Sequence, residues 1–166
     1  HGEITVAPAL VMIGAVEREL TAGAETESSQ PAFARAGQVN VHGLDGRLWE
    51  MTSHDGMALP TSDQIIVSQR LAEQLQQTAD GVSQPLEAGD EVTVWIELPA
   101  NVPRDTLLGD REEKSSVSLT LKVSHVLPER SGVGRLELNP SQQSPLNAFL
   151  ALDTLRHFPS EIPRLR

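Results

Sequence analysis

The sequence has no cysteine and no tyrosine, and its 166 residues include only two tryptophans and three phenylalanines. Without cysteine the chain can form no disulfide, no thiolate nucleophile and no cysteine-ligated zinc site. Because aromatic residues are scarce, we expect a core built from Val, Leu, Ile and Ala. The longest apolar run near the start spans residues 6–13 and contains Pro8, far short of the ~20 residues that a membrane-spanning helix needs.

Basic residues are also in short supply, since 13 Lys and Arg stand against 23 Asp and Glu, giving a net charge of −10. This balance argues against nucleic-acid binding, for which a basic stripe is expected. It argues equally against docking on an anionic lipid surface. We interpret the acidity as a contribution to solubility.

A search for catalytic patterns finds no Gly-x-Ser-x-Gly elbow and no glycine-rich phosphate loop followed by Lys and Ser or Thr. The five histidines include no pair at metal-ligand spacing on one helix, so the sequence predicts no zinc site. We therefore predict a protein that is not an enzyme, with no catalytic, cofactor-binding or metal-ligating residue.

One alternative is a soluble periplasmic hydrolase or carbohydrate-binding domain. It would use His54 and Asp55, in a glycine-containing loop, together with an acidic connector. Paired carboxylates in such a connector serve hydrolases or bind hard cations. We prefer to interpret the loop with His54 and Asp55 as an ordinary solvated loop, and the acidic connector as a solvated run of charges. The carboxylates concerned are Asp105, Asp110, Glu112 and Glu113.

Hydrophobic periodicity predicts a β-rich chain. Strands 92–98 and 116–127 are expected to pair antiparallel, and segments 17–31 and 99–115 are expected to be mobile loops. The fold class is α+β, with a mixed or antiparallel β-rich sheet and two or three short helices. We expect a single domain over residues 1–166, with two small subdomains as the alternative. Predicted strands cover residues 3–16, 35–44, 65–67, 92–98, 116–127 and 147–152, with a short one at Leu136 and Leu138; helical segments cover 45–51, 69–76 and a turn capped by Asp153.

Individual positions carry further predictions. Ser68 precedes a helical pattern and has the side chain of a helix N-cap. Trp49 is expected in the core, and His125 is expected to continue the apolar face of strand 116–127. Trp95 lies on the face opposite Val92, Val94 and Ile96, which leaves it for a partner or for a second layer.

Five segments, taken in order, resemble the extracytoplasmic domain of FtsX-like, MacB-type ABC-transporter permeases. Each segment alone is common, but the ordered set covers nearly the whole chain. Residues 133–155 are the most informative stretch, because a polar connector there leads into a short strand, an Asp and a helix start. The five segments are residues 9–17, 36–49, 65–72, 89–94 and 148–155.

The resemblance implies a MacB periplasmic-core-like domain that lies outside the inner membrane, in the periplasm, and does no chemistry itself. It would relay conformational change during export, lipoprotein handling or transmembrane signalling. The implied partners are a cytoplasmic ABC ATPase, reached through transmembrane helices, and a periplasmic adaptor or lipoprotein; the parent permease is expected to be dimeric. Because the chain begins His1-Gly2 rather than with Met, we expect a segment of a longer membrane protein, with one hydrophobic span before it and three after it.

Contact with such a partner is predicted at Trp95 and at Ser141, Gln142 and Gln143, in the polar connector 139–147. An ordinary loop is the alternative for the connector. A plain adhesion or scaffold module is a further alternative for the whole chain.

Overall fold

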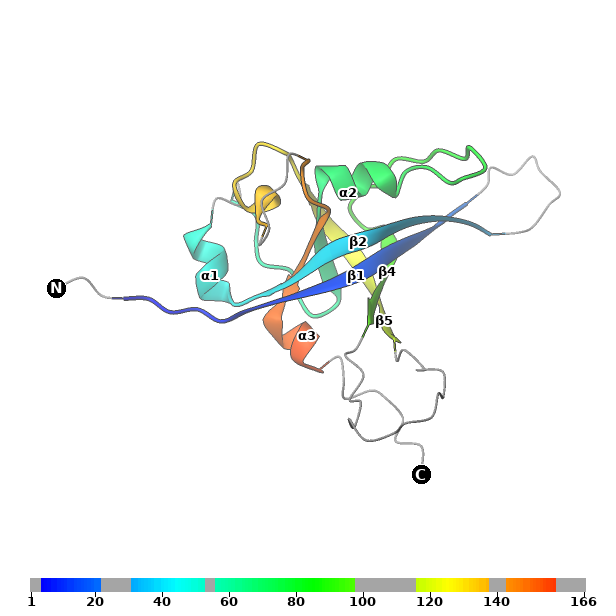
Figure 1. The fold of residues 1–166 in the computed structure, drawn as a ribbon. Helices are drawn as coiled ribbons and strands as arrows, with labels where there is room; N and C mark the ends of the chain where they lie inside the picture. Colours follow the sequence, from blue (N-terminus) through cyan, green and yellow to red (C-terminus); the bar gives the residue numbers. More distant parts are fainter. Residues whose placement is uncertain (1–3, 22–30, 53–55, 98–115, 138–142, 158–166) are drawn as a thin grey trace, which may run out of the picture.

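The strands of the chain close into a six-stranded barrel (Figure 1). The computed structural model describes residues 4–21, 31–52, 56–97, 116–137 and 143–157. The predicted β-rich, mixed architecture with short helices is confirmed; closure of the sheet into a barrel was not predicted. The strands are β1 Ala9–Leu20, β2 Ala32–Leu44, β3 Gln64–Ser68, β4 Glu91–Glu97, β5 Ser116–Leu127 and β6 Asn147–Ala151, and the α-helices are α1 Gly46–Met51, α2 Gln69–Gln74 and α3 Leu152–His157.

The barrel closes because its first strand pairs with β4. The strands follow the order β1-β2-β6-β3-β5-β4, and residues 14–17 of β1 pair antiparallel with residues 93–96 of β4. β2 runs parallel to β6, and β3 runs parallel to β5. β4 and β5 form the antiparallel pair that the sequence predicts. Closure removes the unpaired edges that an open sheet exposes.

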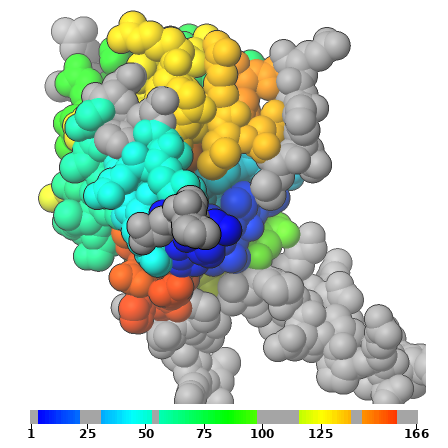
Figure 2. All heavy atoms as spheres, turned by 90° about the vertical axis from the view of Figure 1, so that its left-hand side faces the viewer, coloured from blue at the N-terminus to red at the C-terminus, as the bar shows by residue number. Residues whose placement is uncertain are grey.

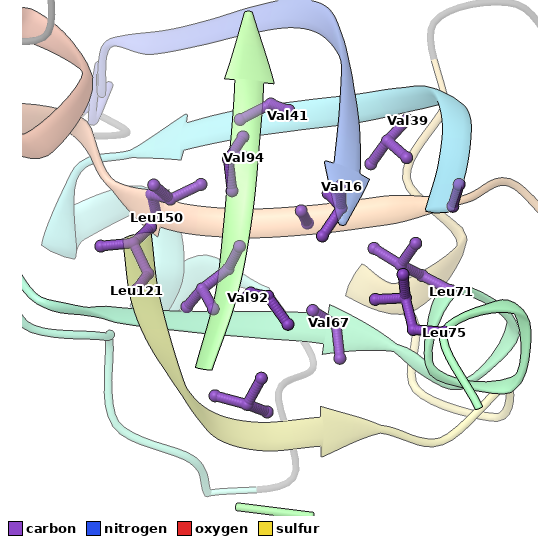
Figure 3. Close-up of a cluster of buried hydrophobic side chains, with 14 of the residues drawn as sticks. Val16, Val39, Val41, Val67, Leu71, Leu75, Val92, Val94, Leu121 and Leu150 are labelled. Carbon is purple, nitrogen blue, oxygen red and sulfur yellow. The ribbon is translucent and has the colours of Figure 1, made fainter. Parts of the chain in front are cut away.

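The barrel interior is filled by branched aliphatic side chains. In Figure 3 residues from all six strands point toward one another, and Leu71 and Leu75 approach from the end where α2 lies. Within the described part of the chain, this cluster contains no aromatic residue, as the composition predicts. Truncating one of its leucines to Ala is expected to cost about 2–5 kcal/mol. Labelled members include Val16, Val39, Val41, Val67, Val92, Val94, Leu121 and Leu150.

A second apolar layer covers part of the outer wall of the barrel. It contains Leu44, Ile66 and Phe149 from the strands, with Trp49 from α1. The indole Nε1–H of Trp49 donates to the carbonyl of Met57 at 2.8 Å, which confirms the predicted core role of this tryptophan. Figure 2 shows the α1 region in cyan next to the start of β1 in blue, with the segment after β5 in yellow and α3 in orange-red on the same face.

Two helices begin at side-chain caps, and one of these, Ser68, is the N-cap that the sequence predicts. Asp45 accepts a hydrogen bond from the backbone N–H of Arg47, and Ser68 accepts one from Leu71. Each bond satisfies a backbone donor that a helix start leaves free. The prediction that Asp153 caps the last helical turn is wrong: α3 begins at Leu152, so Asp153 lies in its first turn.

Two loop or strand predictions are wrong. Segment 17–31 was predicted as a loop, but β1 continues to Leu20 and β2 begins at Ala32; residues 22–30 lie outside the described ranges. A strand was predicted at Leu136 and Leu138. Residues 133–135 form a 3₁₀ turn and Leu136 follows it without strand pairing, whereas Leu138 lies outside the described residues. The cause is local: Leu136 N–H bonds back to the carbonyl of Val133 and closes a turn.

His125 was predicted on the apolar face of its strand, yet it is exposed. The register of β3 against β5 shifts between Ile65 and Ile66, whose partners are Val123 and His125. Ser124 is therefore an extra residue on β5, and a bulge of this kind moves every later side chain to the opposite face.

A buried arginine near the end of β1, in the segment that was wrongly predicted as a loop, holds the β1–β2 hairpin in place. The guanidinium of Arg18 is 3% exposed and lies 2.7 Å from Asp90. It also donates to the carbonyls of Leu75, Gln84 and Pro85, at 3.3, 2.8 and 2.9 Å respectively. A buried charge is tolerated when it is paired and fully hydrogen-bonded, and this one fixes the hairpin on the segment that follows α2.

Candidate functional site

Of the residues predicted to contact a partner, Trp95 is the one around which the structure builds a site. It lies on β4, half-buried, with its side chain on the outer face, as predicted. Gln143 lies elsewhere, exposed and 3.4 Å from a guanidinium nitrogen of Arg70 on α2. Ser141 and Gln142 lie outside the described residues. So do the residues of the hydrolase alternative, namely His54, Asp55, Asp105, Asp110, Glu112 and Glu113.

A hollow of about 540 Å³ lies beside Trp95, and we call it the Trp95 hollow. Segments far apart in the sequence form it, because closure of the barrel pairs β1 with β4, while β2 lies on the other side of β1. Its volume is within the range of sites that hold small molecules or anchoring side chains, about 300–1,000 Å³. The lining residues are Ile13, Gly14, Ala15, Arg35, Gly37, Gln38, Trp95, Glu97 and Ser116.

One wall of the Trp95 hollow is a β-bulge. The register of β1 against β2 shifts between Gly14 and Val16, whose partners are Val39 and Ala36. Gly37 and Gln38 therefore both oppose Ala15. Gln38 has a φ of +55° and is the one non-glycine residue with positive φ in the described chain. Such a conformation costs about 1–2 kcal/mol for a residue with a Cβ, and bulges of this kind frequently lie next to functional sites.

The floor of the hollow requires a glycine. A Cβ built at Gly14 would overlap the backbone oxygen of Trp95. β1 and β4 thus approach each other more closely here than any side chain at position 14 would allow. This approach sets the position of Trp95 relative to the bulge.

The indole nitrogen of Trp95 is the unexplained polar atom of the hollow. It is buried, and no acceptor within the described ranges bonds to it. Leaving a buried donor unpaired costs about 1–3 kcal/mol, and native structures contain few such groups. An oxygen acceptor brought within hydrogen-bond distance of this nitrogen would remove the penalty.

The charges around the hollow are of both signs. Arg35 pairs with Glu17 at 3.5 Å, with both side chains partly exposed, so this ion pair contributes little to stability. Glu97 also interacts with another group of the protein, so it is not a free carboxylate. Arg35 and Gln38 also line the hollow; both residues are exposed and carry N–H donors.

Sequence reasoning identified Trp95 but missed the rest of the hollow. The available signal was Gly37, which interrupts the alternation of residues 35–44 and marks a bulge. Gln38 follows it directly and adopts the strained backbone conformation with positive φ. Nothing local to β2, however, indicates that β4 lies close by.

A second polar cluster, also missed, lies on the outer face of β2 and β6. Asn147 is fully buried, and its side-chain amide donates to the carbonyls of Gly134 and Leu136 at 3.0 and 2.8 Å. Its Oδ1 must therefore be an acceptor, which makes the Nε2 of His42, 3.1 Å away, the donor. The ring of His42 stacks on Phe149 with 5.0 Å between centroids. We call these contacts the His42–Asn147 cluster.

Burial dominates the titration of His42. The ring is 1% exposed, and its Nδ1 has no hydrogen-bond partner among the residues described. Desolvation lowers the pKa of His42 below 6.5, and the bond to Asn147 opposes this only in part. The neutral Nε2–H tautomer is consequently the form that holds β2 to Asn147.

Comparisons with known proteins do not assign the chain to a family. No protein-family model matches the chain, and no curated protein matches it significantly. Over the described ranges, none of the helices has the length and apolar character to cross a membrane. The same ranges contain no group of three His, Asp or Glu side chains arranged to hold a metal ion.

Proposed function

We propose that this chain is the extracytoplasmic domain of an FtsX-like, MacB-type ABC-transporter permease, and that it contacts a partner or substrate protein rather than catalysing a reaction. The support is the ordered set of five sequence segments that resemble this family. Each segment corresponds to an element or pair of elements of the fold. They are β1, β2 with α1, β3 with α2, the turn into β4, and β6 with α3.

The Trp95 hollow is the observation that carries the contact. It combines a buried, unsatisfied indole donor, a strained Gln38 and a close approach of two strands at Gly14. Strained backbone and unpaired polar atoms persist where the surrounding structure over-determines them, and they concentrate at binding sites. Tryptophan is also among the residues that dominate the binding energy of protein interfaces.

The donors in the hollow indicate the chemistry of the partner segment. Trp95, Gln38 and Arg35 present N–H groups, and the exposed side chain of Ile13 adds apolar surface. An extended peptide offers carbonyl oxygens to such donors and apolar side chains to such a surface. The occupant we propose is therefore a peptide segment of an extracytoplasmic adaptor, lipoprotein or other exported protein.

The architecture suits a relay. A closed barrel with a close-packed interior moves as a rigid body, because packed cores do not deform continuously. Motion applied to the ends of the domain by flanking transmembrane helices would then move the Trp95 hollow as a unit. In this proposal the parent permease is a dimer that works with a cytoplasmic ABC ATPase.

The family assignment is tested by the gene that encodes the segment. We expect one hydrophobic span of about 20 residues before the segment and three after it. An ATPase gene beside it would add to the case. A parent protein with no hydrophobic span on either side would contradict the assignment.

The contact is tested by photo-crosslinking in the full-length parent protein in its native membrane. A photoreactive residue replaces Gln38 at the hollow, and the matched control places it at Glu73, which is exposed on α2. We expect one extracytoplasmic protein to be crosslinked from position 38 and not from 73, with at least a tenfold loss when Trp95→Ala is added. Equal crosslinking from both positions, or no effect of Trp95→Ala, would contradict the contact.

A further inference from the structure

A second hollow is lined by residues from the start of β5 and from α3; Figure 1 shows where these two elements lie. We call it the mouth pocket; it has a volume of about 360 Å³. Its main walls are Val117 and Leu119 from β5, Thr154 and His157 from α3, with Ser62 at the side. The mouths of β-barrels are frequent positions for small-molecule sites, and the volume is within the usual range.

The inner wall of the mouth pocket is continuous with the barrel core. Val117 and Leu119 alternate in step with Leu121, which points inward, and both pack against the core cluster while staying partly exposed. The pocket thus reaches the apolar interior from its open end. A ligand filling it would bury the remaining apolar surface of these two side chains, which is favourable in proportion to the area removed from water.

Thr154 supplies the polar feature of the pocket. Its Oγ1 is buried and makes no hydrogen bond to any described residue. A threonine inside a helix can bond through this atom to a carbonyl three or four residues earlier, but those residues of Thr154 lie in β6, before α3 begins. Its hydroxyl here stays unused, beside an apolar wall, and native structures contain few such groups.

The charged groups at the rim are already engaged. Asp153 is largely exposed and lies 3.5 Å from Arg156. His157 donates from Nδ1 to the carbonyl of Asp153 at 2.7 Å. A charged ligand would have to move its own charge from water to the wall formed by Val117 and Leu119, which is costly without a buried partner. The chemistry therefore favours a neutral ligand.

We propose that the mouth pocket binds a small, neutral, largely aliphatic molecule with one carbonyl oxygen. The aliphatic part would contact Val117 and Leu119, and the oxygen would accept a hydrogen bond from Thr154 Oγ1. This site is separate from the Trp95 hollow, and it does not depend on the function proposed above.

The test uses the 166-residue chain and two probes of matched shape. Cyclohexanone carries the carbonyl, and methylenecyclohexane replaces its oxygen with a CH₂ group. Each is titrated while backbone amide shifts are followed by ¹⁵N–¹H NMR. We expect saturable shifts for both probes, centred on residues 117–119 and 152–157, with the ketone binding about tenfold more tightly because of one additional hydrogen bond.

Three variants distinguish the effect of the Thr154 hydroxyl on affinity from the effect of the shape of the pocket. Thr154→Val removes the hydroxyl and is expected to weaken ketone binding about tenfold while leaving hydrocarbon binding unchanged. Thr154→Ser keeps the hydroxyl and should restore the preference for the ketone. Thr120→Val is the matched control, because Thr120 lies on β5 with its hydroxyl 3.2 Å from that of Thr93; it should change neither affinity.

Two results would overturn the proposal. Shifts that stay linear with concentration, or that fall on residues away from β5 and α3, would mean that the pocket binds neither probe. Equal weakening of both probes by Thr154→Val, with no recovery in Thr154→Ser, would mean that the hydroxyl does not select the ligand.

Discussion

The outer face of β2 borders two polar regions that differ in how they are covered. At one end, the His42–Asn147 cluster lies beneath the segment that follows β5, and Asn147 satisfies two of the carbonyls of that segment. At the other end, the Trp95 hollow is open, and its indole N–H finds no acceptor among the described residues. Both regions contain an unpartnered buried nitrogen, but only the first is enclosed by the chain itself.

The difference separates a structural polar cluster from a candidate binding site. In the His42–Asn147 cluster, nearly every bond ties one element of the fold to another, so removing a member should cost stability. In the Trp95 hollow, the strained Gln38 and the unpaired Trp95 hold no elements together through side-chain bonds that the structure shows. Removing them should cost little stability, and the loss should fall on binding instead.

The largest effect is expected for Asn147→Ala. The substitution leaves the carbonyls of Gly134 and Leu136 and the Nε2–H of His42 without their partner. Each unsatisfied buried group costs about 1–3 kcal/mol, so we expect the free energy of unfolding to fall by about 4 kcal/mol, measured by urea denaturation. Asn40→Ala is the matched control, since Asn40 makes one partly buried bond to Asn147. Similar losses for the two variants would contradict the structural role of Asn147.

The second prediction concerns pH. Because burial holds the folded-state pKa of His42 below 6.5, the unfolded chain takes up the proton first as the pH falls. Stability is therefore complete above pH 6.5 and falls below it, by at most about 1.4 kcal/mol per pH unit for one proton, until the folded-state pKa is passed. Urea denaturation at several pH values measures this slope.

His42→Phe should remove that slope, whereas His125→Gln, at an exposed histidine, should keep it. Hydrogen bonds from Arg47 and Thr61 lower the pKa values of Asp45 and Asp63 respectively. Their contributions are lost only as the pH falls below the ordinary carboxyl value of 3.8, so the two windows are separate. A slope between pH 6.5 and 5 that persists in His42→Phe would exclude His42 as its source.

At the hollow, Gln38→Gly should raise stability. The φ of +55° at this position is strained for Gln but free of strain for Gly, so we expect a gain of about 1 kcal/mol in the free energy of unfolding. The same variant removes a donor at the rim and should weaken noncovalent binding of the partner, measured by titrating the variant chain with it. A loss of stability would show that the side chain of Gln38 has a structural role.

The smallest stability effect is expected for Trp95→Phe. The substitution keeps a ring on β4 and removes an indole N–H that has no partner within the described structure. Removing the unpaired donor relieves a penalty of about 1–3 kcal/mol, and the smaller ring buries less apolar area, which costs a similar amount. The two effects oppose each other, so the unfolding free energy should change by less than about 0.5 kcal/mol. A loss above 2 kcal/mol would place Trp95 with the structural residues.

Periodicity and capping patterns predicted six strands and the cap at Ser68, because alternation and capping are properties of neighbouring residues, but they placed a strand at Leu136 and a cap at Asp153 wrongly. The outward placement of Trp95 and the buried role of Trp49 followed from the same logic. The features that sequence periodicity missed depend on single inserted residues and on contacts between residues far apart in the sequence. The bulge at Ser124 reversed the face of His125, and Arg18 is buried only because its acceptors lie on the segment after α2. The Trp95 hollow exists only because β1 pairs with β4.

The two tryptophans allow one measurement to test the central claim. In ¹⁵N–¹H spectra of the 166-residue chain, the indole N–H of Trp49, bonded to Met57, serves as an internal control for that of Trp95. The chain is titrated with the protein that crosslinks from position 38. We predict that the Trp95 indole signal moves saturably while the Trp49 signal stays in place. A Trp95 signal that stays fixed at saturating partner would contradict the assignment of the Trp95 hollow as the contact site.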